Sequence, residues 1–300
     1  MEYFGGIEAG GTKFVCVISS GPDNIIVEEK FATVSPDETI SKVINFFQNS
    51  SYELKIKIKS LGIGSFGPIN LDKSSSKYGY ITTTPKPGWQ NVDIVRPLKD
   101  KLQIPIAFDT DVNAAAIGEG KWGAGIGIDN YLYFTIGTGI GGGAIINGLP
   151  LHGLIHPEMG HILLNRNNLL DPYKGKCPFH QNCFEGLASG PAINERWGKP
   201  AYQLPPDHKA WILEADYIAQ AMSNFIYAFS PQKIILGGGV MQQKHLFSTI
   251  RSKTLEYLNG YVNSTQILDN IENYIVPPSL GNRSGMLGAI AMAQMIVSPV

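Results

Sequence analysis

The stretch GGIEAGGTKFVCVIS, Gly5–Ser19, decides the fold. Apolar runs flank its central glycines, which is typical of a strand, a tight turn and a second strand. The same arrangement returns in YLYFTIGTGIGGGAII, Tyr131–Ile146, where glycines again separate two apolar runs. Two such glycine hairpins, one opening each half of the chain, predict a duplicated α/β fold with a cleft between two lobes.

Helices are predicted between the glycine clusters. Ser35, Pro36 and Glu38 precede apolar residues at helical spacing and have the pattern of a capping box. Further apolar helices are predicted from Asp207 and from Asn282. The glycines of KIILGGGVM, residues 233–241, are predicted to open another helix after a short buried strand.

The glycine-rich stretch at residues 117–125 indicates a boundary between lobes. We predict a small N-terminal α/β lobe, 1–117, on which the C-terminal helix of about 283–300 packs back. A larger α/β lobe, 118–300, would contain the remaining motifs. Three hundred residues are long for one hydrophobic core, which favours this division.

Composition excludes several classes of protein. The formal net charge is −1 and no basic block is present, so no electrostatic footprint for nucleic acid is visible. The N-terminus lacks the basic and apolar regions of a signal peptide, and no apolar run reaches membrane-spanning length. We therefore expect a cytoplasmic protein that binds neither nucleic acid nor membranes.

The glycine hairpins are candidate phosphate sites. The chain has no G-x-x-x-x-G-K-[ST] loop, and a strand rather than a helix follows GTGIGG, which excludes a dinucleotide fingerprint. Exposed N–H groups at a tight turn can still bind an anion. A single glycine cluster is more often a plain turn, but two matching hairpins with threonine at the turn favour phosphate binding.

Carboxylates follow a short strand in FDTDVNAAAIGEG, Phe108–Gly120. Asp109 and Asp111 lie at the end of that strand, where α/β proteins commonly place ligand-contacting groups. The alternative is an aspartate that only caps the following helix. The pattern alone leaves both interpretations open.

Two of the three cysteines lie together in KCPFHQNC, residues 176–183. Cys177, His180 and Cys183 have ligand spacing, and His161 in HPEMGH can complete a Cys₂His₂ set. Zinc prefers four such ligands in closed structural sites. A catalytic zinc hydrolase or deaminase is disfavoured, because four protein ligands leave no open position for water.

Six segments together resemble the ROK family of sugar kinases, and bacterial ROK-type fructokinases in particular. They are EAGGTK from Glu8, DTDVNAAAIGEG from Asp109, TIGTGIGGG from Thr135, HPEMGH from His156, CPFHQNCFEGLASGPAI from Cys177 and LGGGVM from Leu236. The resemblance covers nearly the whole chain. It implies the two-lobed actin/hexokinase-like (ribonuclease H-like) fold and transfer of the ATP γ-phosphate to a hexose. D-fructose would be the substrate, with mannose or glucose as alternatives.

The resemblance also implies site residues. Asp111 would be the catalytic base, and Mg²⁺ would accompany ATP. The expected ATP-binding residues are Gly10, Gly11, Thr12, Lys13, Thr138, Gly139, Gly190, Pro191, Gly237, Gly238, Gly239, Val240 and Met241. The expected sugar-binding residues are Gly67, Pro68, Asp111, Glu158, His161 and Glu185, and structural Zn²⁺ would bind His161, Cys177, His180 and Cys183.

The sequence departs from the family pattern at several points. Glu8 replaces a common aspartate, and Thr110 stands where glucokinase-like members have asparagine. Cys-x₂-His-x₂-Cys replaces the usual Cys-x-Cys-x₄-Cys. A repressor of the same family is disfavoured because the first phosphate motif begins within a few residues of Met1. A sugar sensor without turnover is disfavoured by the intact Asp111, and a homodimer is the family expectation.

Overall fold

The computed structural model describes residues 1–297, so residues 298–300 of the predicted C-terminal helix lie outside the described residues. The chain packs into two compact units. Unit 1 comprises Met1–Ile126, Pro150–Pro157 and Arg283–Val300; unit 2 comprises Gly127–Leu149 and Glu158–Asn282. The predicted division into two lobes, 1–117 and 118–300, remains a proposal, which limited proteolysis would test.

Unit 1 contains a five-stranded sheet with the order β3-β2-β1-β4-β7. β1 and β2 form the first glycine hairpin, and β3 continues it antiparallel. β4 and β7 are added parallel to β1, so the carboxyl ends of these strands meet at one edge. The strands are β1 (Tyr3–Ala9), β2 (Lys13–Ser19), β3 (Ile25–Ala32), β4 (Ile58–Ser65) and β7 (Ile106–Thr110).

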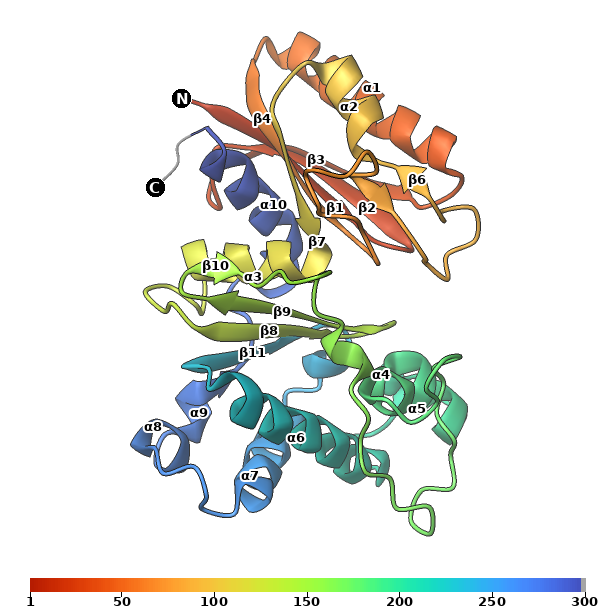
Figure 1. The fold of residues 1–300 in the computed structure, drawn as a ribbon, viewed down its shortest axis with the longest axis vertical. Helices are drawn as coiled ribbons and strands as arrows, with labels where there is room; N and C mark the ends of the chain where they lie inside the picture. Colours follow the sequence, from red (N-terminus) through yellow and green to blue (C-terminus); the bar gives the residue numbers. More distant parts are fainter. Residues whose placement is uncertain (298–300) are drawn as a thin grey trace. The chain divides into compact units, whose positions relative to one another are not determined.

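Helices cover both faces of this sheet (Figure 1): α1 (Pro36–Leu54) and α2 (Val95–Leu102) on one face, α3 (Asp111–Trp122) and α10 (Ser284–Met295) on the other. A Cβ on Gly5 would meet Phe47 of α1, and one on the adjacent Gly6 would meet Ile290 of α10. α10 also crosses α3 closely, because a Cβ on Gly288 would lie 1.7 Å from the carbonyl oxygen of Ala114. Only glycine permits that approach.

The predicted capping box is wrong. Ser35 does occupy the N-cap of α1, but its side chain makes no capping hydrogen bond. Glu38 instead pairs with Lys42 at 2.7 Å, one turn further along the helix. The carboxylate that the box requires is therefore engaged elsewhere.

Unit 2 repeats the same plan, with the strand order β10-β9-β8-β11-β12. β8 and β9 form the second glycine hairpin, and β11 and β12 are parallel to β8. This identical order confirms the predicted duplicated α/β fold. The strands are β8 (Tyr131–Ile136), β9 (Ile140–Ile146), β10 (Leu149–Pro150), β11 (Lys233–Gly237) and β12 (Ile275–Val276).

α6 (Ala210–Phe229) packs on the unit 2 sheet, where the rings of Phe134 and Phe225 lie 4.9 Å apart, and α7 (Leu246–Leu258) packs beside it. The glycines after β11 open only a short 3₁₀ turn, η3 (Val240–Gln242), rather than the predicted helix. The remaining elements are β5 (Tyr80–Ile81), β6 (Val92–Asp93), η1 (Met159–His161), α4 (Phe184–Ala188), α5 (Gly190–Trp197), η2 (Ala201–Gln203), α8 (Thr265–Leu268), α9 (Ile271–Tyr274) and η4 (Gly281–Arg283). Among residues 1–297, no helix has both the length and the apolar character needed to cross a membrane.

Candidate active site

The first predicted phosphate motif forms the turn between β1 and β2. The Gly10 N–H donates to the carbonyl of Lys13 at 2.9 Å, and the Thr33 hydroxyl donates to the carbonyl of Gly10 at 2.7 Å. Thr12 and Lys13 are exposed at this turn. Burial raises the pKa of the neighbouring Glu8, and the positive charge of Lys13 opposes that shift.

The other predicted nucleotide segments come together within unit 2, around the turn between β8 and β9. The Gly190 N–H, at the start of α5, donates to the carbonyl of Gly137 at 2.7 Å. A Cβ on Gly137 would lie 3.6 Å from the nitrogen of Gly239. Gly238 adopts a φ of +92° against the backbone of Ile136, a conformation that requires glycine. The structure thus brings together three predicted segments, Thr138–Gly139, Gly190–Pro191 and Gly237–Met241.

Asp111 is the first residue of α3. The residue that caps this helix is Thr110, whose hydroxyl accepts a hydrogen bond from the Asn113 N–H at 3.1 Å. An aspartate is therefore not needed as the cap, and that alternative interpretation is wrong. Asp111 lies directly after β7, at the carboxyl edge of the unit 1 sheet, and its Oδ1 accepts from the Val112 N–H at 2.9 Å.

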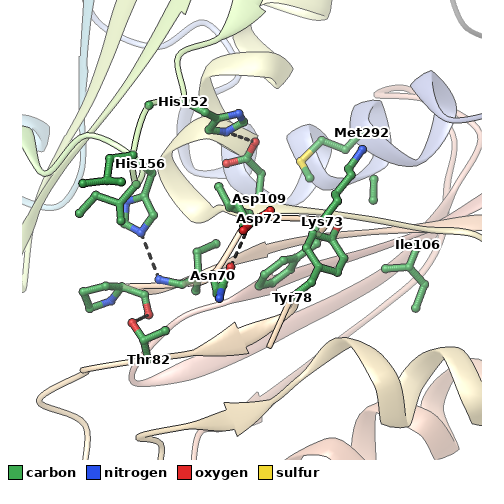
Figure 2. Close-up of a pocket in the computed structure, with 18 of the residues that line it drawn as sticks. Asn70, Asp72, Lys73, Tyr78, Thr82, Ile106, Asp109, His152, His156 and Met292 are labelled. Carbon is green, nitrogen blue, oxygen red and sulfur yellow. Dashed lines mark hydrogen bonds and ion pairs between the residues drawn. The ribbon is translucent and has the colours of Figure 1, made fainter. Parts of the chain in front are cut away.

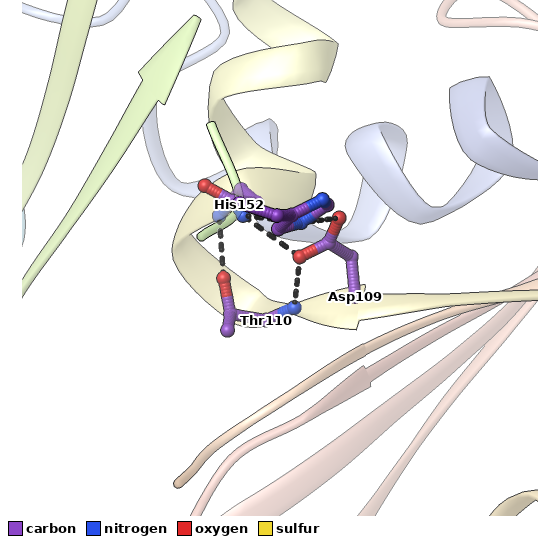
Figure 3. Close-up of polar contacts among 4 residues, drawn as sticks. Asp109, Thr110 and His152 are labelled. Carbon is purple, nitrogen blue, oxygen red and sulfur yellow. Dashed lines mark hydrogen bonds and ion pairs between the residues drawn. The ribbon is translucent and has the colours of Figure 1, made fainter. Parts of the chain in front are cut away.

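A polar network around Asp109 was not predicted from the sequence (Figure 3). His152 Nε2 lies 2.9 Å from Asp109 Oδ2, and Asn113 Nδ2 donates to Asp109 Oδ1 at 2.8 Å. The Thr110 N–H also donates to Oδ1, at 2.7 Å. The hydrogen bond to Asp109, opposed by burial, raises the pKa of His152. No local sequence signal links Asp109 with a histidine 43 residues away.

A pocket of about 990 Å³ lies within unit 1, beside this network (Figure 2). Its wall includes Pro68, which follows Gly67 through a cis peptide bond. The His156 ring lies on the same wall, and its Nε2 accepts from the Ile69 N–H at 3.1 Å. Gly67 and Pro68, predicted to contact sugar, are thus next to His156, which the sequence did not single out for this role.

The remaining predicted sugar ligands belong to unit 2. Desolvation and, next, the negative charge of Glu185 raise the pKa of Glu158 to about 7. Glu185 also has a contact that was not predicted: its Oε2 accepts from the Ile140 N–H at 2.9 Å, at the end of the second glycine turn. Glu185 therefore holds the second glycine hairpin with one oxygen and has a second oxygen for other contacts.

The four predicted metal ligands lie together, with all donor atoms within 4.8 Å of one another. His161 Nδ1 is 3.8 Å from the sulfur of Cys177 and 3.5 Å from that of Cys183. His180 Nδ1 is 3.7 Å from Cys177 Sγ. Zinc–ligand bonds of about 2.3 Å to sulfur and 2.0 Å to nitrogen place the ligands of a tetrahedron about 3.6 Å apart. Both the donor chemistry and the spacing fit zinc.

Comparison with known proteins agrees with this architecture. A solved structure, the ROK family glucokinase from Streptomyces griseus in complex with glucose and AMPPNP, matches with a TM-score of 0.77. The match covers 98% of this chain and 99% of that chain at 23% identity. The duplicated sheets therefore define the actin-like fold of the sugar kinases.

The family follows from the sequence comparisons. The sequence profile of the ROK family matches residues 4–296, so the chain belongs to the ROK family. A Bacillus subtilis (strain 168) protein, provisionally named a fructokinase, is 51% identical over 289 residues, covering 96% of this chain and 94% of that protein. The fructokinase of Pediococcus pentosaceus is 46% identical and covers 97% of each chain.

Proposed function

We propose that this protein is an ATP-dependent hexose kinase that converts D-fructose to fructose 6-phosphate. The observation that carries this proposal is the start of α3, where Asp111 follows β7 in a chain that also contains both glycine hairpins. The fructokinases at 51% and 46% identity support fructose as the sugar. Mannose and glucose are the alternative substrates.

Asp111 is assigned as the general base. It would accept the proton of the attacking sugar hydroxyl, a contribution that is typically about 10²–10⁴-fold in rate. The exposed turns at Gly10–Lys13 and Thr138–Gly139 would bind phosphate oxygens through backbone N–H and threonine hydroxyl groups. The segments Gly190–Pro191 and Gly237–Met241 would hold the nucleotide. Mg²⁺ bound with ATP supplies charge compensation on the phosphate oxygens.

Glu158, Glu185 and His161 are assigned to the sugar together with Gly67 and Pro68. Carboxylates accept hydrogen bonds from sugar hydroxyls, and Glu185 keeps one oxygen available beyond its bond to Ile140. His161 directs Nδ1 toward the cysteine sulfurs, so Nε2 remains as a donor for a hydroxyl. One histidine can therefore belong to both the metal set and the sugar set.

Zinc is assigned a structural role at His161, Cys177, His180 and Cys183. The metal would supply cross-links within a long loop, and its four protein ligands leave no open position for a reacting water. Cys183 also caps α4, because its sulfur accepts from the Gly186 N–H at 3.4 Å. The ligand set would thus fix the start of the helix that contains Glu185.

The test is a hexose panel. Steady-state ADP release should give the highest kcat/KM with fructose and lower values with mannose and glucose. ADP release that does not depend on any hexose would overturn the kinase proposal, and a preference for glucose would overturn only the choice of sugar. We further propose a cytoplasmic homodimer, and light scattering on the purified chain would show a monomer if the dimer is wrong.

A further inference from the structure

Residues Pro150–Pro157 form a strap that packs with unit 1, although the chain on both sides of it belongs to unit 2. Two histidines attach the strap to the segments that contain the proposed site residues. His156 accepts from Ile69, one residue after Pro68. His152 contacts Asp109, two residues before Asp111. Figure 2 shows both rings on the pocket wall.

The two rings have opposite hydrogen-bonding roles. Asp109 can only accept as a carboxylate, so His152 Nε2 carries a proton and donates to it across 2.9 Å. His156 Nε2 accepts an N–H, so its proton must be on Nδ1. Of the two rings, it is therefore His152 that donates to Asp109, a carboxylate that is 5% exposed, and in its protonated form it also brings a positive charge.

Asp109 transmits this contact to α3. Its Oδ1 accepts from the Thr110 N–H at 2.7 Å and from Asn113 Nδ2 at 2.8 Å. Both donors belong to the first turn of α3 or its cap. Asp111 lies between Thr110 and Asn113 in sequence, so the Asp109 carboxylate is bonded to residues on both sides of it; Figure 3 shows the bonds to Asp109.

We propose that His152 is a positioning residue of the phosphoryl-transfer site: by fixing Asp109 it holds the start of α3, and with it Asp111, in the reactive position. His152 itself performs no proton transfer with the substrate. The inference rests on the proposed function, because it takes Asp111 as the base. A misplacement of about 1 Å in a reacting group can cost on the order of a hundredfold in rate.

The test compares His152→Ala with His152→Gln, whose amide can still donate to Asp109. His152→Ala should lower kcat by about tenfold to a hundredfold, with KM for ATP and fructose changed by less than about twofold. His152→Gln should recover most of the lost kcat. Adding His152→Ala to Asp109→Asn should lower kcat little further, because each change alone already removes the same His152–Asp109 contact. His245→Ala, on the exposed surface of unit 2, is the matched control.

A second readout does not depend on turnover. Titration of the His152 ring by NMR should show a pKa above that of an ordinary histidine, and Asp109→Asn should lower it. Unchanged kcat in His152→Ala, or no recovery in His152→Gln, would overturn the positioning role. If the wild type fails to phosphorylate any hexose, or if Asp111→Asn keeps full turnover, the proposed function fails instead. The NMR result then still decides whether the His152–Asp109 pair exists.

Discussion

The starts of α3 and α4 are both capped by a side chain, but different groups hold each cap in place. Thr110 caps α3 and Cys183 caps α4, and each side chain accepts the N–H three residues later. Each cap precedes a proposed site carboxylate, Asp111 in one helix and Glu185 in the other. The start of α3 is held by a hydrogen-bonded histidine and carboxylate, whereas the start of α4 is held by a residue of the Cys/His cluster.

This difference predicts different sensitivities. The His152–Asp109 contact strengthens when the imidazole is protonated, because the ring then adds a positive charge to the hydrogen bond that Nε2 donates to the carboxylate. The cluster around Cys183 has only thiol–imidazole contacts of 3.5–3.8 Å among the described residues, so in the proposed zinc site the metal bonds would supply most of its cross-linking. A change of pH should therefore affect the start of α3, and removal of the metal by a chelator should affect the start of α4.

Asp111→Asn should give the largest effect, since it removes the proposed base while α3 and its cap remain. We expect kcat to fall by about 10²–10⁴-fold while fructose binding, measured by calorimetry, is largely retained. Asp100→Asn, at an exposed position of α2, is the matched control. Wild-type turnover in Asp111→Asn would show that the start of α3 does not carry the base.

Loss of the proposed metal should come next. Cys177→Ser should remove zinc as measured by elemental analysis and should lower kcat/KM by about tenfold to a hundredfold. The segment around Glu185 should also exchange its amide hydrogens faster, because the loop loses its cross-link. Cys16→Ala changes the remaining cysteine, which is buried in β2, and should keep the metal. A variant that loses zinc but keeps the wild-type KM for fructose would show that the Cys/His cluster does not position Glu185 for the sugar.

How far the sequence predicted each region depends on how local the contacts are. Cys177, His180 and Cys183 lie within seven residues, so their spacing alone indicated a shared ligand set. The hairpins were similarly visible, because glycines interrupt apolar runs that are contiguous in the chain. The contact of Asp109 with His152 depends on where the strap packs, which no local pattern encodes. Glu185 was assigned to sugar, but its bond to Ile140 requires two segments 45 residues apart to meet.

The caps of α1 and α3 offer a smaller and more direct test. Thr110 accepts a capping hydrogen bond, whereas Ser35 occupies an N-cap without making one. Thr110→Ala should therefore cost about 1–2 kcal/mol of unfolding free energy, and Ser35→Ala only a few tenths. Urea denaturation of the two variants measures the difference. Equal losses would mean that the hydroxyl of Thr110 contributes nothing specific to the start of α3.

The smallest effect should be the pH dependence contributed by His156. Burial lowers the pKa of its imidazole, and Asp109 and His152 act on it with opposite signs. Below the ordinary histidine value of about 6.5 the unfolded chain binds a proton that the folded chain does not, so stability falls as pH falls toward the lowered pKa. Protonation would also remove the acceptor used by the Ile69 N–H.

His156→Gln keeps an acceptor but cannot titrate, so its unfolding free energy should fall less between pH 7 and pH 5.5 than that of the wild type. His152 contributes in the opposite direction, because its raised pKa gives stability that is present below about 6.5 and is lost as pH rises through the raised value. Adding His152→Gln to His156→Gln removes the opposing contribution, so the difference in pH slope between the double and the single variant measures His152. Identical slopes in the wild type and both variants would show that neither attachment is sensitive to protons.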